Sequence, residues 1–159
     1  MRHTITILVE NQFGVLARVS GLFSARGYNI DSLCVAETLD PAVSRMTVVV
    51  RGDDRVLEQI MKQLNKLVET IEVKDLTQED HVERELVMVK VAADNKIRSE
   101  IVEIATIFRA KVIDIGKEAM TVEVTGSEGK IEAFVDMMRP FGIQELVRTG
   151  KIAIARSPK

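Results

Sequence analysis

The sequence is poor in the residues that build aromatic cores or covalent cross-links. It has no Trp, one Tyr, five Phe and a single cysteine, Cys34, among 159 residues. One cysteine cannot form an intrachain disulfide, so a reducing, cytoplasmic compartment is expected. The interior must instead be assembled from Ile, Val, Leu and Met.

Long apolar runs and an excess of one charge are also missing. No apolar run approaches membrane-spanning length, and the first residues lead into an alternating pattern rather than the apolar core of a signal peptide. The 22 basic and 24 acidic residues are well mixed and give a net charge of −2, without the basic stripe that phosphate backbones need. We therefore expect a soluble protein with neither a nucleic acid nor a membrane as partner.

What the sequence does contain is one order of elements that occurs twice. Alternating apolar residues predict strands, and apolar residues three and four apart predict helices. In the first half we expect strands at 4–9, 30–38, 45–50 and 70–73, and helices over 15–26 and from Asp53 to about residue 67. In the second half we expect strands at 86–91, 112–115, 120–124 and 143–147, and helices after Asp94 and after Ser127. Each half therefore reads β-α-β-β-α-β.

This order predicts an α+β protein with two tandem ferredoxin-like βαββαβ units. A polar linker at 77–83 places the domains at 1–77 and 78–159. Thr149-Gly150 resembles a two-residue hairpin turn into an extra strand at 152–155. Val48, Val49 and Val50 predict a strand buried on both faces, and we expect dimerisation with a second copy of the chain to supply that burial.

Residues for catalysis or metal binding are not grouped in the sequence. His3 and His81 fall in a strand and a linker, and with Cys34 as the only thiol they make no metal cluster. Residues 126–130 lack the first glycine and the hydroxyl residue of a phosphate-binding loop, so they are interpreted as a helix start. We expect no catalytic residue, no metal site and no cofactor in this chain.

The segment most suited to binding a small molecule is the first strand–loop–helix junction. Gly14 would let a carboxylate approach the free N–H groups at the start of the helix, and the amide oxygen of Asn29 could accept from an ammonium group. Val15, Leu16 and Ile30 could line a pocket for an aliphatic side chain. Together these features describe a site for a free amino acid. The spacing fits equally well the alternative that Asn11 and Gly14 are ordinary turn and cap residues and that Asn29 merely follows a helix end.

The runs at 11–19 and 22–30 resemble the start of an ACT domain. The run at 26–33, Arg-Gly-Tyr-Asn-Ile-Asp-Ser-Leu, is specifically similar to the regulatory (small) subunits of acetolactate synthase, also called acetohydroxyacid synthase. Residues 44–47, 59–67 and 81–86 agree further, so the resemblance covers nearly the whole chain.

The resemblance implies a partner and a regulatory role. In that family a catalytic large subunit holds thiamine diphosphate, Mg²⁺ and FAD, and the small subunit activates it and makes it sensitive to valine or other branched-chain amino acids. ACT domains pair as a homodimer, with the effector at the interface. Carried onto this sequence, the resemblance implies that Asn11, Gly14, Val15 and Leu16 come from one chain and Asn29 and Ile30 from the other. It implies a partner-interaction or regulatory role for the C-terminal domain.

Two other classes of function remain open from the residues alone. One is a free-standing ACT-type amino-acid sensor that acts on a different enzyme or regulator. The other is a small stand-alone enzyme on a ferredoxin-like scaffold, which hosts many activities. The sequence offers no nucleophile–base pair for such an enzyme, and no helix-turn-helix for a sensor that would act on DNA.

Overall fold

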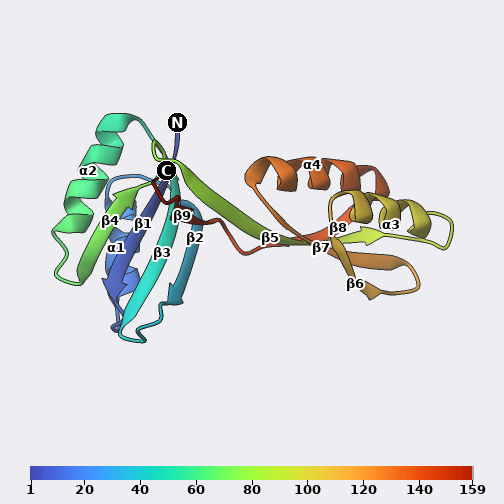
Figure 1. Cartoon of the computed structure of the whole chain (residues 1–159), viewed down its shortest axis with the longest axis horizontal. Helices are drawn as coiled ribbons and strands as arrows, with labels where there is room; N and C mark the ends of the chain where they lie inside the picture. The colour runs from blue at the N-terminus through green and yellow to red at the C-terminus, as the bar shows by residue number, and fades with distance from the viewer. Residues whose placement is uncertain (159) are drawn as a thin grey trace. The chain divides into compact units, whose positions relative to one another are not determined.

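The computed structural model describes residues 1–158, which form two compact units, each built on one antiparallel sheet (Figure 1). The first unit contains Met1–Val82 and the C-terminal segment from Lys151 onward, and the second unit is Glu83–Gly150. Each unit has the βαββαβ order, so the predicted fold class is confirmed.

The first unit carries its sheet in the strand order β2-β3-β1-β4. Its elements are β1 (Arg2–Glu10), α1 (Val15–Ala25), β2 (Ile30–Glu37), β3 (Val43–Arg51), α2 (Asp54–Asn65) and β4 (Thr70–Asp75). Both β2 and β4 are edge strands, and β2 pairs only with β3 within the described residues.

The core of the first unit lies between the sheet and its two helices. Alternate residues of β1 and β3, such as Ile5 and Val48, pack against the inner faces of the helices, where Val19, Phe23 and Leu64 are buried. The apolar faces of the two helices therefore pack on the apolar face of the sheet and form one core layer, as the sequence pattern predicts.

The opposite face of this sheet is also buried, and it is built from small side chains. Thr4, Thr6, Thr47 and Val49 alternate with the core residues of β1 and β3, and each is at most 7% exposed. Burial of β3 on both faces is thus confirmed. The expectation that a second copy is needed for it is wrong, because Val48, Val49 and Val50 are already at most 1% exposed in the single chain.

The second unit repeats the arrangement in the strand order β6-β7-β5-β8. Its elements are β5 (His81–Ala92), α3 (Arg98–Ile107), β6 (Lys111–Ile115), β7 (Ala119–Gly126), α4 (Glu128–Met138), a short 3₁₀ turn (Arg139–Phe141) and β8 (Ile143–Arg148). Phe108 and Phe134 meet edge to face, with ring centroids 5.4 Å apart, in a core otherwise made mostly of Val, Ile and Met.

The C-terminal residues differ from the sequence prediction. Strand β9 (Ile152–Ala155) pairs with β5 and not with β8, so Thr149-Gly150 does not form the expected hairpin. Residues from Lys151 onward group with the first unit, whereas the prediction assigned all of 78–159 to the second domain. A turn sequence predicts a change of direction but not which strand the chain meets afterwards. We name residues 151–158 the C-terminal strap.

Within residues 1–158, no helix combines the length and the apolar character that a membrane-spanning helix requires.

Candidate functional site

The junction between β1 and α1 depends on Gly14. Its φ of 81° lies in the left-handed region, and a Cβ added there would stand 3.2 Å from Nη1 of Arg18. No side chain caps α1, and its first turn contains no acidic residue. The first N–H groups of this helix, together with the positive end of its dipole, therefore offer a place for a carboxylate.

Asn11 has a structural task in the same loop. Its Nδ2 donates to the carbonyl oxygen of Pro41 at 2.9 Å, and its backbone N–H donates to the carbonyl oxygen of Ala42 at 2.7 Å. A second, longer contact joins Nδ2 to Oε1 of Glu37 at 3.5 Å. Asn11 thus fastens the loop to the turn between β2 and β3, and its amide nitrogen is committed to the fold.

Val15 and Leu16 point in different directions from the start of α1. Val15 is 3% exposed and belongs to the core, so its contribution to a pocket is limited to its backbone. Leu16 is 45% exposed and stands at the surface beside the loop. Of the two, Leu16 has the side chain that can contact a ligand.

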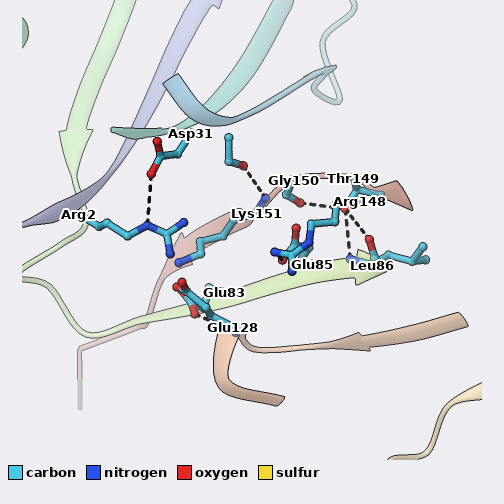
Figure 2. Close-up of polar contacts among 11 residues, drawn as sticks. Arg2, Asp31, Glu83, Glu85, Leu86, Glu128, Arg148, Thr149, Gly150 and Lys151 are labelled. Carbon is cyan, nitrogen blue, oxygen red and sulfur yellow. Dashed lines mark hydrogen bonds and ion pairs between the residues drawn. The ribbon is translucent and has the colours of Figure 1, made fainter. Parts of the chain in front are cut away.

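Asn29 is held by its neighbour Asp31. The Nδ2 of Asn29 donates to Oδ1 of Asp31 at 3.0 Å, while Oδ2 of Asp31 accepts from Nε of Arg51 at 2.7 Å and lies 3.7 Å from Nε of Arg2. Figure 2 shows the contact between Arg2 and Asp31. A carboxylate can only accept, so the amide nitrogen of Asn29 must face Asp31. Its amide oxygen is therefore left available for an ammonium group.

The pairing of β2 with β3 slips by one residue between Ile30 and Ser32, and Asp31 is the residue between them. Such a bulge re-aims a side chain that a regular strand would place on a sheet face. Sequence reasoning missed Asp31 as a supporting residue. It stands two positions after Asn29, but its partners Arg2 and Arg51 come from other strands, and no local pattern pairs them.

The six predicted site residues do not come together within one chain. Ile30 lies opposite Val50, at the end of the sheet where β1 begins, whereas Glu37 lies opposite Ser44, at the end where β1 runs into the Gly14 loop. From Asn29 to Glu37 an extended strand covers about 26 Å, at about 3.3 Å per residue. The structure therefore places Asn11, Gly14, Val15 and Leu16 at one end of β2, and Asn29 and Ile30 at the other end.

Two hollows on the surface of the described residues lie away from the six predicted site residues. A hollow of about 530 Å³ lies near the C-terminal ends of α1 and α2, and it contains none of the six residues; it is lined by Arg26, Gln59, Lys62, Gln63, Asn65 and Lys66. In the described part of the chain, no three His, Cys, Asp or Glu residues are grouped so that they could hold a metal ion.

Comparison with known protein families matches both units. Residues 5–72 match the model described as the AHAS small subunit-like ACT domain, and residues 84–157 match the model described as the small subunit of acetolactate synthase. Together these two matches cover most of the sequence.

Similar proteins match over nearly the whole length of this chain. The chain is 55% identical over 159 residues to the probable acetolactate synthase small subunit of Archaeoglobus fulgidus, covering 100% of this chain and 99% of that protein. It is 49% identical to the acetolactate synthase small subunit of Aquifex aeolicus, covering 98% of this chain and 81% of that protein. The crystal structure of the small subunit from Thermotoga maritima superposes with a TM-score of 0.91 at 39% identity, covering 100% of this chain and 99% of that one.

The fold and the matched domains define an ACT-domain protein, a class that supports a regulatory role. The chain belongs to the family of acetolactate synthase small subunits, which implies a catalytic large subunit as its partner.

Proposed function

We propose that this chain activates the catalytic subunit of acetolactate synthase and makes it sensitive to feedback inhibition by valine or a related branched-chain amino acid. The chain itself contributes no catalytic group. Thiamine diphosphate, Mg²⁺ and FAD belong to the catalytic subunit in this proposal. Cys34, as the only cysteine, agrees with work in the cytoplasm.

The observation that carries the proposal is the separation of the two half-sites along the edge strand β2. When an edge strand pairs antiparallel with its own copy around a two-fold axis, its start lies opposite the end of the partner's strand. Gly14 of one chain would then approach Asn29 of the other. The same pairing would close the open edge of β2, where Val35 is 41% exposed.

The chemistry of the two half-sites is complementary to a free amino acid. The uncapped start of α1, with Gly14 before it, suits the α-carboxylate, and the amide oxygen of Asn29 suits the α-ammonium group. Leu16 and the half-buried Ile30 supply apolar surface for an aliphatic side chain. Each half-site alone satisfies only one end of the ligand, so ligand binding and dimerisation would support each other.

Regulation would then be a coupling free energy between the effector site and the catalytic subunit. Valine would stabilise one arrangement of the small-subunit dimer, and the catalytic subunit would have different activity with that arrangement. A coupling of about 1–3 kcal/mol, or roughly 5–150-fold in affinity, is typical of such systems.

The test is turnover of pyruvate to acetolactate by the purified catalytic subunit, measured alone, with this chain, and with this chain while valine is titrated. We expect the chain to raise turnover and valine to lower it again. A chain that binds the catalytic subunit but leaves turnover unchanged, with and without valine, would contradict the proposal. Leucine and isoleucine, titrated in parallel, rank the three effectors.

A further inference from the structure

The C-terminal strap is attached to the strand that carries Asn29. The backbone N–H of Lys151 donates to Oγ of Ser32 on β2 at 2.9 Å, and Nη2 of Arg45 on β3 donates to the carbonyl oxygen of Ala153 at 3.0 Å. Lys151 and Ala153 are 9% and 7% exposed, whereas Ile152 and Ile154 between them are 56% and 62% exposed. The strap is therefore a strand that lies on the outer face of the first sheet.

The far end of the strap is fixed as well. The backbone N–H of Arg156 donates to the carbonyl oxygen of Asp80 at 2.9 Å, and Nε of Arg156 lies 3.1 Å from Oδ1 of Asp80. Since β9 pairs with β5, the segment that leaves the first unit and the segment that returns to it form one antiparallel ribbon.

On the side of the second unit, the chain is held immediately before the strap. The Oγ1 of Thr149 accepts from the N–H of Leu86 at 3.1 Å, and the N–H of Thr149 donates to the carbonyl oxygen of Leu86 at 3.1 Å (Figure 2). Thr149 is thus held by Leu86 of β5 in the second unit, whereas Lys151 is held by Ser32 of the first.

One residue, Gly150, separates these two attachments. Its φ of 88° lies in the left-handed region that other residues rarely adopt. The backbone between the anchor of Lys151 on Ser32 and the anchor of Thr149 on Leu86 is therefore one residue long.

From this arrangement we infer that the strap is the connector that carries effector occupancy from β2 to the second unit, through Ser32, Lys151, Gly150 and Thr149. The inference rests on the proposed function, because it assumes that a ligand binds beside Asn29. Ser32 lies three residues after Asn29, on the far side of the Asp31 bulge. Ligand contact with Asn29 orders the start of β2, which strengthens the anchor of Lys151. Ser32 is a positioning residue in this scheme and does not contact the ligand.

The first measurement is amide hydrogen exchange of the full-length chain, with and without valine, followed at residues 149–156. We expect valine to slow exchange in the strap of the wild-type chain. In Ser32→Ala, which removes the acceptor of the Lys151 N–H, we expect faster exchange in the strap that valine no longer slows. Ser32→Thr keeps a hydroxyl group and should restore the response. Ser24→Ala, on the exposed side of α1, is the matched control.

The second measurement is valine inhibition of the reconstituted enzyme. Because such coupling is reciprocal, valine should bind Ser32→Ala somewhat more weakly than wild type in calorimetry. The concentration needed for half-inhibition should rise at least about fivefold beyond that loss of affinity, the lower end of typical couplings. If wild-type chain neither binds valine nor transmits inhibition, the proposed function fails. If wild-type and Ser32→Ala complexes are inhibited equally, or valine leaves strap exchange unchanged, the connector is overturned while the proposed function stands.

Discussion

The amide of Asn29 is oriented by the carboxylate of Asp31, which accepts its Nδ2 hydrogen at 3.0 Å. Asp31 is in turn held by Arg51, so that a residue of the candidate site is positioned through charges drawn from another strand. A group that is already oriented binds its ligand without losing further side-chain freedom. Asp31 is therefore expected to matter for effector binding without touching the effector.

Replacing Asp31 by Ala tests this positioning role. Freed from its acceptor, the Asn29 amide can rotate, and we expect valine affinity measured by calorimetry to fall about tenfold, which corresponds to about 1.4 kcal/mol. Asp136→Ala, which removes the comparably paired but exposed carboxylate beside Arg139, should leave valine affinity unchanged. Equal affinities of Asp31→Ala and wild type would show that Asn29 needs no support from Asp31.

Replacing Gly14 by Asp tests the carboxylate half of the site. The new side chain places a negative charge at the start of α1, where the ligand carboxylate is expected, and we predict that valine binding is abolished while activation of the catalytic subunit is largely kept. Gly14→Asn is the matched control, because Asn has the same size, tolerates positive φ and carries no charge. Comparable losses of valine affinity in Gly14→Asp and Gly14→Asn would attribute the effect to backbone strain and not to charge.

Asn29→His tests the ammonium half. The imidazole cannot reproduce the amide that donates to Asp31 and accepts from the ligand with the same geometry. We expect the reconstituted enzyme to lose its inhibition by valine while turnover without valine persists. Inhibition at wild-type valine concentrations would remove Asn29 from the site.

Replacing Asn11 by Asp tests its structural task. An ionised carboxylate cannot donate to the carbonyl oxygen of Pro41, and it would also repel Glu37. We expect the free energy of unfolding in urea to fall by about 1–2 kcal/mol, against about 0.5–1.5 kcal/mol for Asn11→Ala, which removes the hydrogen bond alone. Should Asn11→Asp prove as stable as wild type, the loop does not depend on this contact.

Replacing Val35 by Glu tests the pairing of β2 with a second copy. Val35 is already 41% exposed, so the fold of one chain should tolerate the change. A charge at the centre of the paired edge strands should convert a dimer into monomers in analytical ultracentrifugation and weaken valine binding with it. Val102→Glu, at a residue of α3 that is 44% exposed, serves as control and should remain dimeric. A dimeric Val35→Glu chain would place the interface elsewhere.

The N-terminal and C-terminal segments of the chain show most clearly which structural features the local sequence pattern can predict. The alternation of Ile5 and Ile7 and the helical spacing of Val19 and Phe23 correctly predicted the first strand, the first helix and their buried faces. Thr149-Gly150, in contrast, predicted a hairpin, although β9 pairs with β5. Turn residues report backbone conformation at their own position, and the partner of the next strand is chosen by contacts from residues far away along the chain.

In the candidate site, too, the local sequence predicted some features and missed others. Gly14 stood out in the sequence because it has no side chain to keep a carboxylate away from the start of the helix. Its positive φ is a further reason for glycine that the structure adds. Val15 was expected to line the pocket, but the 3.6-residue period of α1 turns it into the core, where it is 3% exposed. Asp31 forms ion pairs with Arg2 and Arg51, and the three residues lie on three different strands. Only the folded sheet therefore brings these charges together.

The sequence by itself determined the repeated βαββαβ order, the apolar faces of helices and strands, and the family to which the chain belongs, because each of these is recorded in short runs of neighbouring residues. Tertiary structure alone decided that Gly14 and Asn29, the residues of the proposed half-sites, stand at opposite ends of β2, and that the C-terminal strap returns to the first sheet to meet Ser32. Both depend on strand register and long-range pairing, which are set by the packing of the whole sheet.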